Sequence, residues 1–158
     1  MNPNEISERF YFTHFQEKDF KEILNLWVDT DMGHPERKDS ASTILRCNSF
    51  GGKLIVMKQN SNNEIVGTSW LTYDGRRIFL HHFGIKPYWQ GHGLGKALGV
   101  ESMKFIKSKG AQVKLEVQRN NSKAKRIYEN LGFFSFEDYD VYMLRNVGAS
   151  TSSASDPS

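Results

Sequence analysis

The sequence has almost no cysteine and no long apolar run. Cys47 is the only cysteine among 158 residues, so an intrachain disulfide and a cysteine-based metal site are excluded. No stretch approaches the roughly 20 apolar residues that span a bilayer. Residues 1–10 alternate polar and charged side chains and lack the apolar core of a signal peptide. We therefore expect a cytoplasmic protein with no membrane partner.

The sequence also lacks a concentration of charge of one sign. It carries 21 Lys and Arg against 18 Asp and Glu, a formal net charge of +3. The basic residues are dispersed, whereas a nucleic-acid-binding surface usually gathers them into a stripe. We therefore predict no nucleic-acid partner, although mild basicity also suits an anionic ligand.

Hydrophobic residues at 38% and charged residues at 25% are typical of one globular domain of this length. The apolar patterns predict an α+β fold with a central mixed, mostly antiparallel sheet flanked by helices. The expected elements are a strand over residues 9–15, helices over 17–31 and 40–48, strands over 53–58, 65–73 and 77–85, a helix over 93–109, a strand over 113–117, a helix over 121–131 and a final strand pair over 133–136 and 141–144.

The C-terminal residues 148–158 are small, polar and low in complexity. We expect a single domain over residues 1–147 and a disordered tail over residues 148–158.

A glycine-rich turn between an expected strand and an expected helix is the strongest chemical signal. It reads Gln90-Gly91-His92-Gly93-Leu94-Gly95-Lys96. Glycine allows a positive φ and lets a ligand approach the backbone closely. The start of the following helix presents free N–H groups and the positive end of its dipole at the same place. The turn therefore predicts a pyrophosphate site.

Two better-known phosphate motifs do not fit this turn. A P-loop needs four residues between its first glycine and Gly-Lys-Ser/Thr, but only three separate Gly91 from Gly95, and Ala97 replaces the hydroxyl. A dinucleotide-binding fingerprint needs a third glycine where Lys96 stands. The remaining pattern is Gln/Arg-x-x-Gly-x-Gly, and its alternative is an ordinary strand-to-helix turn.

A second motif follows about thirty residues later. It reads Asn121-x-x-Ala124-x-x-x-Tyr128-x-x-x-Gly132-Phe133. On a helix, Asn121, Ala124 and Tyr128 lie on one side, because residues three and four apart are neighbours. Ala124 leaves room for a ligand, and Tyr128 offers a hydroxyl. The alternative is an amphipathic helix with a tyrosine packed in the core.

Together, the two motifs and the element order resemble the GNAT superfamily of acyl-CoA N-acyltransferases over Phe10 to Arg145. The resemblance implies the GNAT fold, acetyl-CoA as co-substrate, and direct attack by a primary amine in a ternary complex. The amine would belong to a protein N-terminus, a lysine or a small molecule. The resemblance also implies that pantetheine inserts between two splayed strands, the first of which carries Gly84, and that the Ile85 N–H is an oxyanion donor.

The cofactor-binding residues implied by the resemblance come from both motifs. Gln90 stands where most relatives carry Arg, so backbone amides would do most of the holding. Asn121 would hydrogen-bond pantetheine, or it would only cap its helix. The full set is Ile85, Gln90, Gly91, His92, Gly93, Leu94, Gly95, Lys96, Asn121 and Ala124.

Three residues are candidates for catalysis. Tyr128 matches the family's tyrosine that protonates the departing thiolate. Many relatives carry a glutamate as base on the strand before the loop, where this chain has His81 and His82, and an unperturbed histidine accepts a proton near neutral pH. Because successive strand residues point to opposite faces, only one histidine is expected in the cleft. Because the two side chains diverge, we also predict no metal site. The alternative is that each histidine is only a half-buried residue that packs in the sheet.

Two further points stay open in the sequence. A non-catalytic acyl-CoA-binding sensor would carry the same loop, although the retained Tyr128 favours an enzyme. Exposed strand edges often pair between copies, so a homodimer is one expected state.

Overall fold

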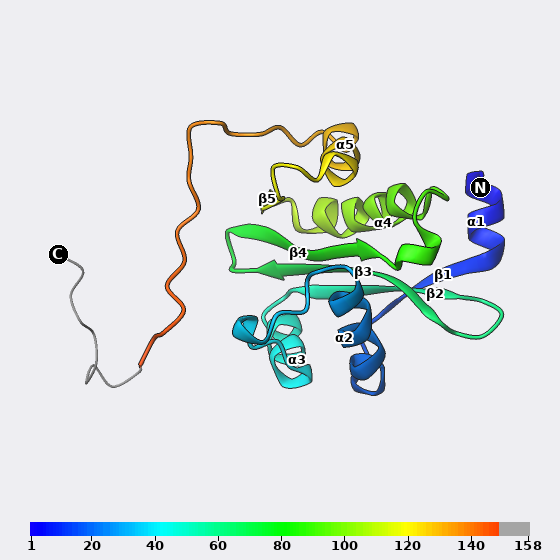
Figure 1. Ribbon diagram of the computed structural model, residues 1–158, viewed down its shortest axis with the longest axis horizontal. Helices are drawn as coiled ribbons and strands as arrows, with labels where there is room; N and C mark the ends of the chain where they lie inside the picture. Colours follow the sequence, from blue (N-terminus) through cyan, green and yellow to red (C-terminus); the bar gives the residue numbers. More distant parts are fainter. Residues whose placement is uncertain (149–158) are drawn as a thin grey trace.

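A five-stranded sheet in the order β1-β2-β3-β4-β5 forms the centre of the protein, whose residues 1–148 are described in a computed structural model (Figure 1). The first four strands pair antiparallel, and β4 and β5 pair parallel. The strands are β1 (Phe10–His14), β2 (Lys53–Gln59), β3 (Ile65–Tyr73), β4 (Arg77–Ile85) and β5 (Gln112–Leu115). The predicted mixed, mostly antiparallel sheet is confirmed. The expected tail lies outside the described residues, apart from Gly148.

Helices cover both faces of the sheet. In Figure 1, α2 (Phe20–Asp29) and α3 (Ala41–Ser49) lie on one face, and α4 (Leu94–Lys109) and α5 (Ser122–Asn130) lie on the other. Two separate apolar clusters result, one beneath each helix pair. Short 3-10 turns complete the chain at η1 (Glu17–Asp19), η2 (Pro35–Arg37) and η3 (Pro87–Trp89). Within residues 1–148, none of the helices combines the length and apolar character needed to cross a membrane.

The first helix, α1 (Pro3–Arg9), was not predicted. Its local signal is a capping box: the Asn2 side chain accepts from the Glu5 N–H, and the Glu5 carboxylate accepts from the Asn2 N–H. Pro3 occupies the first turn, where its missing N–H costs nothing. The helix buries Ile6 and lies beside the start of α4 (Figure 1).

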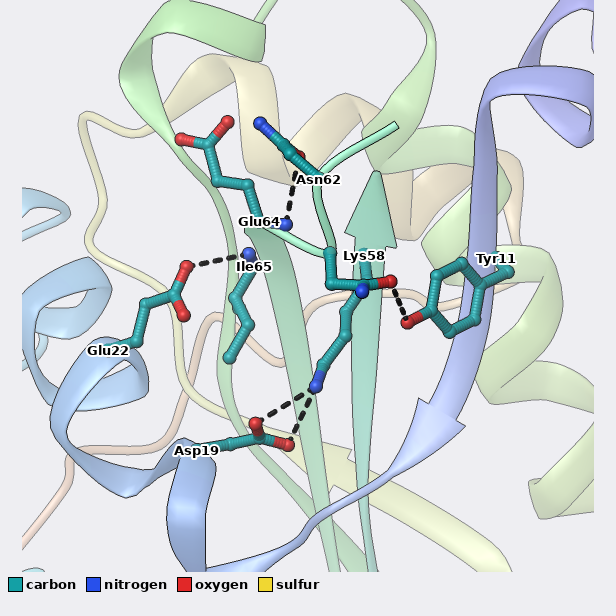
Figure 2. A network of polar contacts seen from close by, with 8 residues as sticks. Tyr11, Asp19, Glu22, Lys58, Asn62, Glu64 and Ile65 are labelled. Carbon is teal, nitrogen blue, oxygen red and sulfur yellow. Dashed lines mark hydrogen bonds and ion pairs between the residues drawn. The ribbon is translucent and has the colours of Figure 1, made fainter. Parts of the chain in front are cut away.

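Polar contacts fasten the start of α2 to the sheet. Lys58 Nζ lies 2.9 Å from both carboxylate oxygens of Asp19, and both residues are buried. The Glu22 carboxylate accepts a hydrogen bond of 2.8 Å from the Ile65 N–H. Figure 2 shows both contacts: Asp19 meets Lys58 of β2, and Glu22 meets Ile65 of β3. They fix the position of α2, which packs Trp27 against the strands.

The predicted final strand pair, residues 133–136 and 141–144, is wrong. Neither segment forms a strand, and Figure 1 shows the chain running away from the body after α5. Alternating apolar residues indicate which positions a strand would bury, but a strand also needs a partner edge. Here neither segment pairs with an outer strand of the sheet, β1 or β5, and the large apolar side chains that follow Phe133 are exposed. They are Phe134, Phe136, Tyr139, Val141, Tyr142, Met143, Leu144 and Val147.

Candidate active site

The glycine-rich turn joins the end of β4 to the start of α4, as the sequence predicted. Gly91 and Gly93 have φ of 79° and 87°, values that side-chain-bearing residues adopt only at a cost. Gly93 is the N-cap of α4 and offers no side-chain cap. The first intrahelical bond runs from the Ala97 N–H to the Gly93 carbonyl. The N–H groups of the preceding first-turn residues, Leu94 to Lys96, are therefore directed out of the helix start.

Gln90 and His92 stabilise the turn itself. The Gln90 side-chain amide donates to the Ile85 carbonyl at 2.9 Å, which ties the turn to the end of β4. The His92 ring nitrogen Nδ1 lies 3.0 Å from the Gln90 carbonyl. Lys96 is exposed on the first turn of α4. The turn is therefore preshaped by its own side chains and leaves its backbone amides for a ligand.

Strands β4 and β5 separate on the side of the turn. Their parallel pairing runs from Arg77 opposite Gln112 to Leu80 opposite Leu115. Strand β4 continues to Ile85, whereas β5 ends at Leu115. The last residues of β4 thus have no strand on that side within residues 1–148. We call this edge of β4, residues 81–85, which lacks a partner strand in the described part of the chain, the opening.

Helix α5 lies beside this opening and carries the second motif. The Asn121 side chain accepts from the Ala124 N–H at 3.1 Å and so caps the helix. Its oxygen is occupied by this cap, which supports the capping interpretation of Asn121. Ala124 is half-buried and packs against the core cluster under α4 and α5.

Tyr128 points from α5 toward β4. It is 8% exposed, and its ring centroid lies 5.5 Å from that of Phe83 and 5.8 Å from that of Phe133. Burial raises the pKa of the Tyr128 phenol to about 12, because the phenolate would lose its hydration. The hydroxyl is therefore protonated throughout the neutral pH range.

His81 and His82 lie on the same face of the sheet, so the expectation that they point to opposite faces is wrong. Thr68 pairs with Gly84, and Trp70 pairs with His81. His82 and Phe83 therefore stand opposite Ser69 alone, which is a β-bulge. His82 has φ of 45°, and this turns its side chain toward the α2 face.

Three contacts fix the ring and the backbone of His82. Its Nε2 lies 2.7 Å from Asp39 Oδ2, and its ring packs against Trp27 with centroids 4.2 Å apart. The Thr68 hydroxyl donates to the His82 carbonyl at 2.9 Å. The side chains of His82 and Asp39 are only 6% and 14% exposed. Asp39 was not among the predicted site residues, because nothing in its local sequence marks it.

His81 is half-buried on the same face. Its Nε2 lies 2.9 Å from the Thr72 hydroxyl, and its ring stacks on Phe79 with centroids 4.2 Å apart. Burial, assisted by the neighbouring His82, lowers the pKa of His81 from 6.5 to about 4. His81 is therefore neutral at physiological pH and a weak base.

A family model described as the acetyltransferase (GNAT) family matches residues 5–133. The chain belongs to this family. GNAT proteins are acetyl-CoA-dependent acyltransferases that act on amine acceptors, so the resemblance drawn from the two motifs is confirmed.

Solved structures of acetyltransferases share the fold of this GNAT protein. One from Trypanosoma brucei is 24% identical with a TM-score of 0.68, covering 85% of this chain and 99% of that chain. Glucosamine-6-phosphate N-acetyltransferase from Arabidopsis thaliana is 17% identical with a TM-score of 0.63, covering 87% and 98%. AAC(6')-Iy, in complex with the bisubstrate analogue CoA-S-monomethyl-acetylneamine, is 16% identical with a TM-score of 0.66, covering 87% and 99%. At these identities the likeness concerns the fold alone.

Proposed function

We propose that this GNAT protein transfers the acetyl group of acetyl-CoA to a primary amine by direct attack in a ternary complex. One observation carries the proposal. At the point where β4 loses its contact with β5, consecutive residues of β4 reach two different groups: His82 contacts Asp39 on the α2 face, and Phe83 contacts Tyr128 on the α5 face. A base and an acid therefore flank the same opening in the sheet.

The residues at the opening suit acetyl-CoA. The two positive-φ glycines Gly91 and Gly93 and the uncapped start of α4 offer backbone amides to a pyrophosphate. The gap beside the end of β4 would take the extended pantetheine, with the Ile85 N–H as oxyanion donor. Acetyl-CoA supplies the acetyl thioester, whose C–S bond breaks as the C–N bond to the acceptor forms.

Tyr128 is the proposed general acid. Its raised pKa keeps the proton on the phenol at neutral pH, so the hydroxyl can donate to the sulfur that leaves. His82 is the proposed general base, since Asp39 contacts its Nε2 and no hydrogen bond within residues 1–148 engages its Nδ1. The pKa of His81, near 4, makes it the weaker candidate, because a useful base titrates close to the working pH.

An acceptor panel with thiol detection tests the proposed function. The panel should contain an amino-sugar phosphate, an aminoglycoside, a polyamine, and peptides with a free N-terminus or lysine. Acetyl-CoA binding is measured in parallel by calorimetry. Acetyl transfer to at least one amine is expected. Binding of acetyl-CoA without transfer to any of them would instead indicate an acyl-CoA sensor, and failure to bind would overturn both.

A further inference from the structure

Asp39 is placed by local structure that does not depend on His82. It lies between Lys38, whose φ is 56°, and Ser40, the N-cap of α3. The Ser40 hydroxyl accepts from the Thr43 N–H at 3.1 Å. The left-handed residue on one side and the cap on the other fix the backbone of Asp39. These two features bring the Asp39 carboxylate to the sheet, where its Oδ2 lies 2.7 Å from His82 Nε2.

The histidine is fixed from the opposite direction. The Trp27 indole N–H donates to the Thr68 hydroxyl at 2.9 Å, and this hydroxyl donates to the His82 carbonyl at 2.9 Å. A non-glycine residue in the left-handed region persists only where its surroundings determine it. Here that chain of donors holds the bulge, and edge-to-face contacts with Trp27 and Trp70 confine the ring.

Only one ring nitrogen of His82 is engaged by the described residues. Its Nε2 meets Asp39, while no hydrogen bond within residues 1–148 involves its Nδ1. A carboxylate accepts and does not donate when ionised, so the proton between the two groups belongs on Nε2. The lone pair of the neutral ring then lies on Nδ1.

We propose that Asp39 is a positioning residue that fixes the tautomer of His82 and makes its Nδ1 the proton acceptor. This inference rests on the proposed function. As the acceptor nitrogen forms its bond to the acetyl carbon, its proton moves to Nδ1, and the ring becomes imidazolium. Asp39 stays ionised and stabilises that cation through the Nε2–H contact. The other charged groups facing this pair are His81 on β4 and Arg37 on η2, both of which act on the same cluster.

A second His–Asp pair in the chain provides a matched control. His34 Nε2 lies 3.2 Å from Asp31 Oδ1, but the two side chains are 39% and 74% exposed. Water therefore solvates both partners and weakens the contact. Asp31→Asn removes the same kind of pair as Asp39→Asn without touching His82.

Heteronuclear NMR of the imidazole nitrogens tests the inference without an acceptor. In the wild-type protein at neutral pH, His82 should be the Nε2–H tautomer, assigned by comparison with His82→Gln. In Asp39→Asn the tautomers should mix, and in Asp31→Asn they should not. An Nδ1–H tautomer in the wild type overturns the inference, whether or not any variant folds well.

Kinetics with an amine identified by the panel provides the second readout. Asp39→Asn should lower kcat by roughly 100-fold, the lower end of what a general base contributes, and leave the KM for acetyl-CoA unchanged. Asp39→Glu should recover part of the rate. An unchanged kcat in Asp39→Asn contradicts the role of Asp39. Absence of turnover in the wild type contradicts the proposed function instead, and the tautomer measurement still decides on Asp39.

Discussion

Gly95 lies directly against Ile127: a Cβ added at Gly95 would come 2.9 Å from the Cδ1 atom of Ile127. The contact joins the first turn of α4 to the middle of α5. One turn later, a Cβ on Gly99 would come 2.7 Å from the Cδ1 atom of Leu131. The two glycines form a smooth surface on which α5 packs. Gly95 thus has a packing role beside the one assigned to the turn.

Gly95→Ala forces the Cδ1 end of Ile127 to shift, which offsets the roughly 1 kcal/mol that Ala gains over Gly inside a helix. We therefore expect the melting temperature to change little. Ile127→Val removes the Cδ1 atom, so the double variant Gly95→Ala/Ile127→Val should be more stable than the sum of the two single effects. Thermal denaturation of the four proteins gives this coupling directly. Additive effects would show that α5 is not in contact with Gly95.

Gly91→Ala should weaken acetyl-CoA binding in addition to destabilising the protein. A Cβ there meets nothing within 4 Å, but the φ of 79° strains any residue other than glycine by about 1 to 2 kcal/mol. Gly75, in the β3–β4 hairpin, is the matched control, since its φ is 89° and its surroundings are equally open. Both Ala variants should lose similar stability, and only Gly91→Ala should lose affinity in calorimetry. Equal affinities would place the pyrophosphate elsewhere.

Tyr128→Phe should lower kcat by roughly 100-fold, the lower end of what a general acid contributes. Acetyl-CoA affinity and melting temperature should change little, because the ring keeps its contacts with Phe83 and Phe133. Tyr142→Phe, at a residue 91% exposed, is the control. Steady-state kinetics and calorimetry separate the two effects. Wild-type turnover in Tyr128→Phe would remove this hydroxyl from the mechanism.

His81 should make the stability of the folded protein depend on pH. The folded-state pKa of His81 is about 4, below its ordinary value of 6.5, so the unfolded chain binds the proton first. The stability that the folded protein gains from a neutral His81 is therefore fully present above pH 6.5. It is lost as the pH falls toward 4. At one pKa unit per about 1.4 kcal/mol, the loss is about 3 kcal/mol at most.

Denaturant unfolding at about pH 7.5 and about pH 4.5 measures that loss. His81→Gln should be less stable than the wild type at the higher pH, yet lose less stability on acidification. His14→Gln, at an exposed position of β1, should keep the wild-type pH dependence. Identical acid sensitivity in His81→Gln and the wild type would show that His81 does not titrate differently on folding.

The Asp19–Lys58 pair should be costly to break from one side only. Removing one partner leaves a buried charge without compensation, and such changes cost about 3 to 5 kcal/mol. Lys58→Met should therefore destabilise the protein strongly, whereas Lys58→Met/Asp19→Leu should restore much of the lost stability. Urea unfolding of both variants tests this. A double variant no more stable than Lys58→Met would indicate that the pair contributes by its geometry rather than by mutual neutralisation.

The local features of this protein were predictable from the sequence. The glycine turn needs positive φ at Gly91 and Gly93, and only glycine adopts it readily, so the residue type marks the conformation. The helix that follows and the capped helix of Tyr128 are specified by periodicity and by Asn121. The missed helix α1 also had a local signal, in Asn2 and Glu5.

What only the tertiary structure decided is how distant segments meet. The bulge at His82 exists only through pairing with β3, so strand periodicity wrongly placed His81 on the face of Phe83 and Ile85. Asp39 lies 43 residues from His82 in the sequence, and no spacing rule links them. The final strand pair failed for the same reason, because tertiary contacts, and not the alternation of a segment, decide whether it pairs with an edge of the sheet. The sequence determined the glycine turn, because only glycine takes its backbone conformation readily, and the packing of α2, α3 and β4 determined that His82 and Asp39 meet.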